Sequence, residues 1–393
     1  MRRLSLRISV VIPLYNAEKF VIETLDSIIN QTHPVDEILV IDDCGSDGSA
    51  GTVEQYSQSH PIVKLIRQPH NQGGSAARNR GMAEAINEWI LLVDADDTVD
   101  PTLVEKQVKL LEQELTNTSI PISAVHSAYV QIDNESQVVS NSVIRGEQLS
   151  HQDLFGSLIV RNFIITPTGM LVNKRMIEEF NGFRTDLKIS EDFDFYLRLA
   201  KAGRMLYIDE VLVNHRRHQT NVTENLSKSL EAGKTIIGMY SLEEIEEAIL
   251  GRRYSEAQNK QDLAKVLYYL DQYEQGYIVL QGIEDDENHN VTLFLKSLYA
   301  LTKNQVDLAH SILRQLVSID EHHIAARNNF AILEAKLGNL VEAKELFEQC
   351  LKQSPGYLDA THNLKVLSGQ LVNGEYKYTF RELRPNLLRY TSL

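Results

Sequence analysis

The sequence is poor in cysteine and has no long apolar run. Its only cysteines, Cys44 and Cys350, are far apart in a chain of 393 residues, which predicts free thiols and favours a reducing, cytoplasmic location. The first apolar stretch, Ile8 to Leu14, is interrupted by Pro13, so it is too short for a signal-peptide core or a membrane-spanning helix. We therefore expect no integral membrane segment.

Positive charge is also scarce. The chain has 54 acidic and 39 basic residues, which gives a formal net charge of −15 at pH 7. A protein that holds nucleic acid over a broad surface, or that docks on anionic lipid, normally presents a basic face. We therefore expect no nucleic acid among its partners.

Two enzyme classes lack their signatures. No G-x-G-x-x-G motif follows the first apolar strand, which argues against a dinucleotide-binding dehydrogenase. A haloacid-type phosphatase has its Asp-x-Asp pair after the first strand, whereas Asp94-Ala95-Asp96 follows the fourth.

Strand and helix patterns alternate in the first part of the chain. Strand patterns cover residues 8–12, 37–41, 63–66 and 90–93, and helical patterns cover 18–29, 48–60 and 74–87. Such alternation predicts βαβ units and a mainly parallel sheet. The length of the chain is sufficient for a second domain.

Carboxylates follow two of these strands. Asp42 and Asp43 come after the second strand, and Asp94, Asp96 and Asp97 come after the fourth. Ligands of such sheets lie beyond the carboxyl ends of the strands. Carboxylates crowded there repel one another unless a cation lies among them, and Mg²⁺ and Mn²⁺ prefer hard oxygen ligands. The alternative is a solvated acidic turn.

Helical patterns replace strand patterns from about Leu226. Four series of residues recur at spacings of 33 and 34. They are Ala264, Ser297 and Ala331; Gly276, Ala309 and Ala343; Tyr273, Val306 and Leu340; and Leu280, Leu313 and Phe347. Repeats of this size must stack to bury an apolar face. They resemble three tetratricopeptide repeats, and residues 358–371 are expected to form a capping helix.

Four motifs in the first part occur in a fixed order. They are residues 10–16 (VVIPLYN), 42–48 (DDCGSDG), 71–79 (NQGGSAARN) and 94–97 (DADD). In this combination they resemble family 2 glycosyltransferases over about residues 7–220. The resemblance implies a GT-A fold and inverting transfer of a sugar from a nucleotide-diphosphate sugar, UDP-linked by family frequency, with Mn²⁺ or Mg²⁺. The predicted organisation is a GT-A domain over 1–225, a helical linker over 226–255, tetratricopeptide-like repeats over 256–371 and a tail over 372–393.

The same resemblance assigns residues to the donor. Asp43 is expected to bind the base, Arg78 a phosphate or the acids of the metal site, and Asp94 and Asp96 the ribose and the metal, with Asp96 as the direct ligand. The predicted donor-binding set is Pro13, Tyr15, Asp43, Gly74, Arg78, Asp94, Ala95 and Asp96. A packed tyrosine at Tyr15 and a structural salt bridge at Arg78 are the alternatives.

A base is expected from residues 190–198. Glu191-Asp192 resembles the family's Glu-Asp motif, in which the second acid is the base, so Asp192 is assigned as the base and Glu191 as second choice. Ser190 is expected to cap the helix that follows. Acids at a helix start also occur for dipole reasons alone.

The stretch 214–218 (NHRRH) resembles a Tyr-Arg-x-His pattern of many relatives. Here His215 replaces the tyrosine, while Arg216 and His218 match. The resemblance implies that His218 ligates the metal or contacts the diphosphate and that the arginines shield it. An exposed basic loop is the alternative. Residues 166–169 (TPTG) resemble a segment that borders the acceptor.

The sequence leaves the acceptor and the repeats open. The first hypothesis is a metal-dependent inverting glycosyltransferase whose repeats hold a protein acceptor, such as a flagellin-like polypeptide, or mediate homo-oligomerisation. The runner-up is a transferase of surface polysaccharide or O-antigen assembly, whose repeats contact other proteins. A third hypothesis is a non-catalytic scaffold that carries a dead transferase domain.

Overall fold

The computed structural model describes residues 6–115, 120–139, 143–217, 226–283, 289–371 and 374–380. The chain divides into two compact units, Met1–Arg253 and Tyr254–Leu393, which are described separately. Within the described residues, no helix combines the length and the apolar character that a membrane crossing requires.

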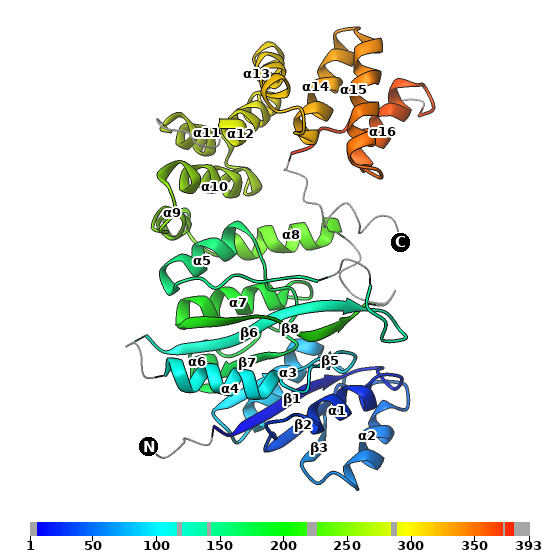
Figure 1. Cartoon of the computed structure of the whole chain (residues 1–393), viewed down its shortest axis with the longest axis vertical. Helices are drawn as coiled ribbons and strands as arrows, with labels where there is room; N and C mark the ends of the chain where they lie inside the picture. Colours follow the sequence, from blue (N-terminus) through cyan, green and yellow to red (C-terminus); the bar gives the residue numbers. More distant parts are fainter. Residues whose placement is uncertain are drawn as a thin grey trace. The chain divides into compact units, whose positions relative to one another are not determined.

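Unit 1 is built on one eight-stranded sheet with the order β3-β2-β1-β4-β7-β6-β8-β5 (Figure 1). Its strands are β1 (Ile8–Leu14), β2 (Glu37–Asp42), β3 (Val63–Arg67), β4 (Trp89–Leu92), β5 (Thr98–Val99), β6 (Ile122–Ile132), β7 (Met170–Asn173) and β8 (Arg204–Arg216). Strands β3, β2, β1 and β4 are parallel, and the predicted αβ fold is confirmed for them. The sheet as a whole is mixed, because β7 pairs antiparallel with both β4 and β6.

Most helices of unit 1 pack against this sheet, while α8 and α9 pack on other helices. They are α1 (Val21–Ile29), α2 (Ser49–Ser57), α3 (Gly74–Glu84), α4 (Leu103–Glu114), α5 (His151–Val160), α6 (Lys174–Glu179), α7 (Glu191–Ala202), α8 (Leu226–Ile237) and α9 (Leu242–Leu250). Figure 1 shows α7 over one face of β6 and β8 and α4 over the other. The apolar side of α1, with Val21, Leu25 and Ile28, is fully buried in the core under β1 and β2.

Helix α3 lies unusually close to the parallel strands. A Cβ on Gly81 would come within 2.4 Å of a methyl carbon of Val11 and 3.1 Å of Ile41, so only glycine permits this approach. The close packing fixes α3 over β1 and β2. Arg78, three residues earlier in the same helix, is thereby held at the carboxyl edge of the sheet.

The segment 226–255, which the sequence analysis assigned to a linker, packs mainly within unit 1. Helix α9 lies on α5, where a Cβ on Gly156 would come within 2.1 Å of the carbonyl oxygen of Ala248. Arg253 pairs with Asp153 at 3.0 Å. Helix α9 therefore belongs to unit 1, and the division between the two units falls after Arg253.

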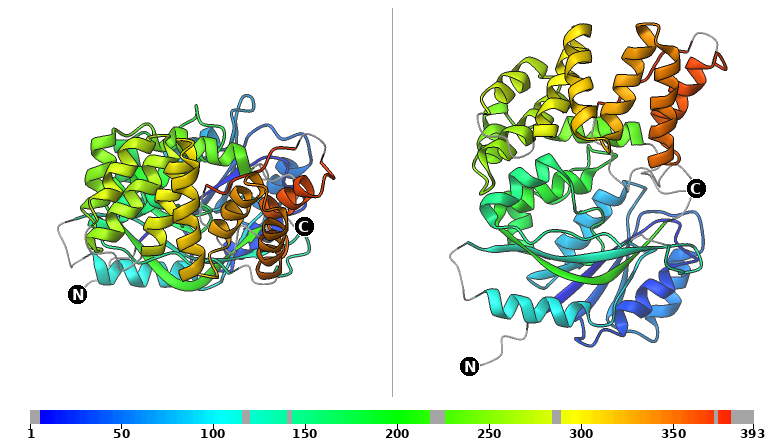
Figure 2. Two further views of the ribbon diagram at one scale, coloured as in Figure 1. Left: turned by 90° about the horizontal axis from the view of Figure 1, so that it is seen from above. Right: turned by 45° about the horizontal axis from the view of Figure 1, so that its top comes forward.

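Unit 2 consists of antiparallel helix pairs, which Figure 2 shows side by side in green to orange. The helices are α10 (Glu256–Tyr269), α11 (Tyr273–Gln281), α12 (His289–Thr302), α13 (Val306–Ile319), α14 (Ile324–Lys336), α15 (Leu340–Gln353) and α16 (Leu358–Leu367). The small residues of the repeat, such as Ala264, Ala309 and Ala343, are fully buried where the helices meet. The predicted helical repeats and the final single helix are confirmed as an architecture. Their assignment to the tetratricopeptide family stays a prediction.

Candidate active site

The charged groups of the candidate active site meet where β4 ends and α3 and α7 begin. Arg78 of α3 donates to an Asp94 carboxylate oxygen at 2.5 Å and lies 3.7 Å from a Glu191 oxygen of α7. The guanidinium also lies over the ring of Phe183, 5.3 Å from its centroid. A buried arginine thus joins residues from three separate motifs, as the fold requires for a site at the carboxyl edge.

Gly74 makes room for this arginine. A Cβ at Gly74 would lie 3.3 Å from a terminal guanidinium nitrogen of Arg78, tighter than ordinary contacts. The preceding Gly73 has a φ of 88°, a left-handed conformation that glycine adopts without strain. Gly73 and Gly74 therefore let the chain turn sharply into α3, and the first turn of this helix leaves space for the Arg78 side chain.

Asp192 lies at the start of α7, beside this cluster. Burial, followed by the neighbouring Glu191 carboxylate, raises the pKa of Asp192 to about 7, although the amide of Phe193 and the charge of Arg78 act in the opposite direction. The Phe193 amide donates to Asp192 at 2.8 Å. A carboxyl group with this pKa can release or accept a proton near neutral pH.

The entry into α7 differs from the prediction in one respect. Ser190 has a φ of 60°, and its side chain makes no capping hydrogen bond, so the expected serine cap is wrong. The left-handed residue instead turns the backbone into the helix. Glu191 and Asp192 consequently occupy the first turn, where the helix dipole favours negative charge.

Tyr196 was not among the predicted site residues. Its hydroxyl is fully buried one helical turn after Asp192 and has no hydrogen-bond partner in the described part of the chain. Burial first, and then the negative charge of Asp192, raise the pKa of this phenol. The four-residue spacing from Asp192 is the only sequence signal that places it on the same face of α7.

Asp43 holds the loop that leads into α3. It is only 3% exposed and accepts hydrogen bonds from the side chain of Gln68 and the backbone amides of Gln72 and Gly73, at 2.7, 2.7 and 2.8 Å. The carboxylate therefore has a clear structural role. Its predicted contact with the base of a nucleotide stays a prediction.

The other residues predicted to contact the nucleotide base lie at the end of β1. Pro13 pairs in register with Ile41 of β2, and Tyr15 follows with 54% of its surface exposed. The side-chain oxygen of Asn16 accepts hydrogen bonds from the amides of Ser46 and Asp47. This ties the loops after β1 and β2 together and leaves the Tyr15 ring accessible to a ligand.

The aspartates of the 94–97 loop have different environments. Asp97 is fully buried and accepts from Thr168 at 2.5 Å and from the Arg216 amide at 2.7 Å. Burial lowers the pKa of His215, but the nearby Asp97 carboxylate raises it more, to about 9, so a charged imidazole pairs with Asp97 at 3.2 Å. Asp97 is therefore a structural anchor, a role that was not predicted from the sequence.

The side chain of Thr168 connects this anchor to the site. Its hydroxyl donates to Asp97 and accepts from the backbone amide of Asp94 at 3.0 Å. Ala95 is held as well, because its carbonyl accepts from Thr24 at 3.0 Å. The loop is therefore fixed from several sides, which holds the carboxylates of Asp94 and Asp96 at the sheet edge.

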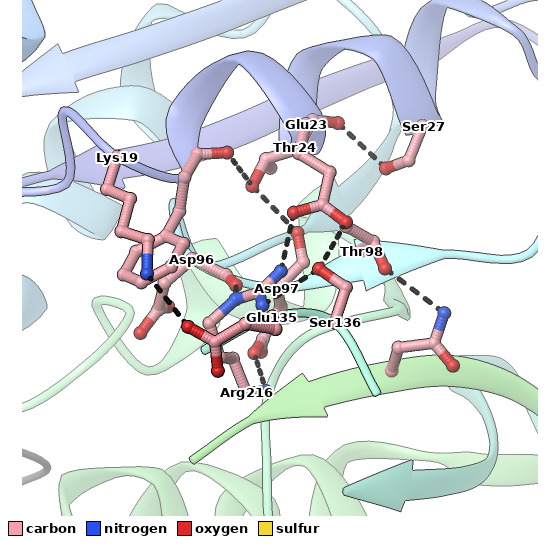
Figure 3. Close-up of polar contacts among 12 residues, drawn as sticks. Lys19, Glu23, Thr24, Ser27, Asp96, Asp97, Thr98, Glu135, Ser136 and Arg216 are labelled. Atoms are coloured by element: carbon pink, nitrogen blue, oxygen red, sulfur yellow. Dashed lines mark hydrogen bonds and ion pairs between the residues drawn. The ribbon is translucent and has the colours of Figure 1, made fainter. Parts of the chain in front are cut away.

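Arg216 is fully buried below the same loop (Figure 3). Its guanidinium donates to the Asp96 and Asp133 carbonyls and the Glu23 carboxylate at 2.7 Å each, and to the Ser136 hydroxyl at 3.0 Å. From the sequence, this arginine was predicted to shield a diphosphate. The structure instead uses it to join the acidic loop to α1 and to the turn after β6.

A metal site is not preassembled in the described residues. They contain no group of three or more His, Cys, Asp or Glu side chains able to hold an ion. Mg²⁺ commonly takes one or two protein carboxylates and completes its shell with water and substrate phosphates. Asp94 and Asp96 offer hard oxygen donors of this kind, so the residues present fit such an ion. His218, the third predicted ligand, lies outside the described residues.

Comparison with known proteins agrees with this geometry. Residues 9–180, somewhat less than half of the chain, match the family model of glycosyl transferase family 2. An uncharacterized glycosyltransferase of Haemophilus influenzae is 28% identical over 236 residues, which are 58% of this chain and 71% of that protein. The putative teichuronic acid biosynthesis glycosyltransferase TuaG of Bacillus subtilis is 22% identical over 223 residues, which are 56% of this chain and 83% of that protein.

One further relative and one solved structure align with different fractions of their own chains. The poly(ribitol-phosphate) beta-glucosyltransferase of Bacillus spizizenii is 28% identical over 216 residues, which are 52% of this chain but 34% of that protein. The crystal structure of S. aureus TarS matches with a TM-score of 0.48 and 18% identity, over 87% of this chain and 55% of that one. The family model places a glycosyl transferase family 2 domain at residues 9–180, and this match, together with the relatives named as glycosyltransferases, supports a transferase.

Proposed function

We propose that the protein transfers a sugar, with inversion, from a nucleotide-diphosphate sugar to an acceptor hydroxyl in a metal-dependent reaction. The observation that carries the proposal is the meeting of Arg78, Asp94 and Glu191 next to Asp192, whose pKa is raised to about 7. A guanidinium, several carboxylates and a carboxyl group whose pKa is near neutrality lie together at one edge of the sheet, which supports the proposal.

Asp192 is proposed to act as the general base. A hydroxyl is a poor nucleophile until its proton is removed, and a base with a pKa near the working pH combines availability with driving force. With its pKa raised to about 7, Asp192 meets this requirement. Glu191 is proposed as a positioning group, because its carboxylate lies near Arg78 at 3.7 Å and its charge helps to raise the pKa of Asp192.

Asp96 and Asp94 are proposed to hold Mn²⁺ or Mg²⁺. Such an ion supplies Lewis-acid stabilisation of the charge that develops on the leaving diphosphate. Arg78 fixes Asp94 through their 2.5 Å contact. Pro13, Tyr15 and Asp43 are proposed to border the base, with a uridine nucleotide as the first candidate.

The acceptor is proposed to be a surface glycan polymer. The relatives named for teichuronic acid and poly(ribitol-phosphate) synthesis align with about half of this chain, which favours that class over the protein acceptor that the sequence analysis put first. A protein acceptor and homo-oligomerisation through unit 2 stay open as predictions. A cytoplasmic location also stays a prediction.

A panel of nucleotide sugars tests the proposal. We expect one sugar nucleotide, with Mn²⁺, to raise the melting temperature by mass action and to release nucleoside diphosphate in the presence of acceptor. Asp96→Asn should lose the metal-dependent part of this stabilisation, whereas Asp186→Asn, an exposed residue paired with Arg184, should not. Binding and release that persist unchanged in EDTA would contradict the metal role. Absence of binding and release across the panel would favour the non-catalytic scaffold.

A further inference from the structure

Unit 2 holds a short extended segment of its own chain against two of its helices. Residues 374–380 carry no regular secondary structure, and their main chain pairs with asparagine side chains of α14 and α16. We call the site formed by Asn328, Asn329, Tyr357, Asp359 and Asn363 the asparagine groove.

The first contact joins Asn329 to Thr379. The Asn329 amide nitrogen donates to the Thr379 carbonyl at 2.8 Å, and the Thr379 backbone amide donates to the Asn329 side-chain oxygen at 2.7 Å. One side-chain amide thereby binds both main-chain groups of one residue. This reproduces the pair of hydrogen bonds that a neighbouring β-strand would supply.

The second contact repeats this geometry two residues earlier. Asn363 donates to the Lys377 carbonyl at 2.9 Å and accepts from the Lys377 amide at 2.7 Å. Asn328 supports it by accepting from Asn363 at 3.0 Å. Residues two apart in an extended chain present their backbone groups in the same direction. The paired hydrogen bonds of Asn329 and Asn363, which we call the two clamps, therefore bind an extended peptide through its main chain.

The side chain of Thr379 occupies a polar pocket. It is 3% exposed, and its hydroxyl donates to Asp359 at 2.8 Å, accepts from Asn328 at 3.2 Å and contacts the Tyr357 hydroxyl. A hydroxyl-bearing residue fits this pocket, because an apolar side chain would leave the Asp359 carboxylate without its donor.

The neighbouring aromatic residues, Tyr378 and Phe380, have different environments. Lys336 lies over the ring of Tyr378 at 5.1 Å from the centroid, and Phe380 is 49% exposed. Alternation along the extended chain turns Tyr378 away from the asparagine contacts and toward the apolar core of unit 2, against which Tyr376 also packs. Main-chain pairing and the threonine hydroxyl therefore act together with the apolar packing of Tyr376 and Tyr378.

The asparagines themselves indicate that the groove is built for a peptide. Asn328, Asn329 and Asn363 are all fully buried. A buried amide that loses its partners costs more than its hydrogen bonds contribute, so helix faces meant only to pack against one another carry apolar residues there instead. Each amide is matched here by main-chain groups of an extended segment.

We propose that the asparagine groove is a peptide-binding site for an extended segment with threonine or serine in the Asp359 pocket. Residues 374–380 of the same chain occupy it and compete with the matching segment of a partner protein. The site lies outside the transferase unit and stands independently of the proposed sugar transfer.

The test uses the full chain and the labelled heptapeptide GEYKYTF, which copies residues 374–380. Thr379→Asp places a second carboxylate against Asp359 and should expel the chain's own segment. We expect the heptapeptide to bind this variant at least about tenfold more tightly than it binds the wild-type chain, as removal of one or two buried hydrogen bonds implies. Phe380→Asp, which adds the same charge at a half-exposed position, should bind like wild type.

Further variants locate the binding. Asn329→Ala in the Thr379→Asp chain should weaken heptapeptide binding by at least about tenfold, because one clamp is lost. A heptapeptide with alanine in place of its threonine should also bind weakly. Equal binding by the Thr379→Asp chain with and without Asn329→Ala would overturn the proposal.

Hydrogen exchange provides an independent check that needs no added peptide. In the wild-type chain the backbone amides of Lys377 and Thr379 should exchange slowly, and Asn329→Ala should release the Thr379 amide. Free exchange of both amides in the wild-type chain would overturn the proposal. A dimer that forms with rising concentration and is abolished by Thr379→Asp would instead assign the segment to the groove of a second copy and overturn intramolecular occupancy.

Discussion

Both units bury polar side chains, but they bury different kinds. At the sheet edge of unit 1 the buried groups are charged, such as Arg78, Asp97 and Arg216. In the groove of unit 2 the central groups are the neutral amides of Asn329 and Asn363. Charges are costly to bury unless paired, and they perturb one another's pKa values. Neutral amides cost less and match the donor and acceptor of a peptide.

The difference shows what each region can do. The charged cluster raises the pKa of Asp192 to about 7 and so prepares a proton acceptor. The amide clamps of unit 2 shift no proton, and they fix the direction and register of an extended chain. One region is suited to chemistry on a polar substrate, and the other to recognition.

The largest expected effect is on catalysis. Asp192→Asn removes the proposed base while keeping its size, so kcat should fall by about 10²–10⁴-fold, the usual contribution of general base catalysis. Steady-state release of nucleoside diphosphate measures kcat. The matched control is Asp186→Asn, the same substitution at an exposed residue in the segment before α7. Unchanged turnover in a folded Asp192→Asn protein would end the assignment of the base.

The next effect tests the structural side of the charged region. Arg216→Met should lower the free energy of unfolding by about 3–5 kcal/mol, because Glu23 and two backbone carbonyls lose a buried charged partner. Arg80→Met, at an exposed position of α3 where Arg80 pairs with Glu84 on the surface, should cost less than about 1 kcal/mol. Urea denaturation followed by circular dichroism distinguishes them, and equal losses would remove the special role of Arg216.

A neutral clamp should cost less than a buried charge. Asn363→Ala removes two main-chain hydrogen bonds from Lys377, and we expect a loss of about 1–3 kcal/mol in the unfolding of unit 2. The same denaturation experiment measures it. A loss as large as that of Arg216→Met would contradict the distinction drawn between the two regions.

The pH dependence of turnover follows from the same carboxyl group. Asp192 must be ionised to accept a proton, so log kcat should fall with unit slope as the pH drops below about 7. Glu191→Gln removes a neighbouring negative charge that raises this pKa, so it should move the acid limb to lower pH. An acid limb that stays in place in that variant would contradict the coupling between the two carboxylates.

The smallest effect is a stabilisation. The folded-state pKa of Asp192 lies above its unfolded value of about 4, so ionisation of this group destabilises the folded protein. This destabilisation grows as the pH rises from about 4 to about 7. Asp192→Asn should therefore raise the melting temperature by a few degrees at pH 8 and have little effect near pH 4. A scanning calorimetry series over pH measures it, and a lower melting temperature at pH 8 would contradict burial of the charge.

Much of the fold was predictable from the sequence because its signals are local. The apolar runs at 8–12, 37–41, 63–66 and 90–93 are fully or partly buried strands, and the recurrence of Ala264, Ser297 and Ala331 marks the helix pairs. The antiparallel insertion of β7 beside β4 was not predictable. Its pairing joins residues about 80 positions apart and leaves no periodic trace in either segment.

The site divided in the same way. Motif order placed Arg78, Asp94 and Asp192 in one family site, and the structure brings their elements together. Motif matching assigned Asp96 to the metal but did not predict the anchoring role of Asp97, because its partners Thr168 and Arg216 are distant in the sequence. It also could not assign Arg216 to a buried position, since its partners come from α1 and from the turn after β6.

The sequence by itself determined the strand–helix alternation, the helical repeats and the acids that follow strands, because periodicity and motif order are written along the chain. Only the tertiary structure decided which acids are anchors, which carboxyl group is raised in pKa and what the asparagines of α14 and α16 bind. Those properties depend on desolvation and on partners distant in sequence, and neither exists until the chain has folded.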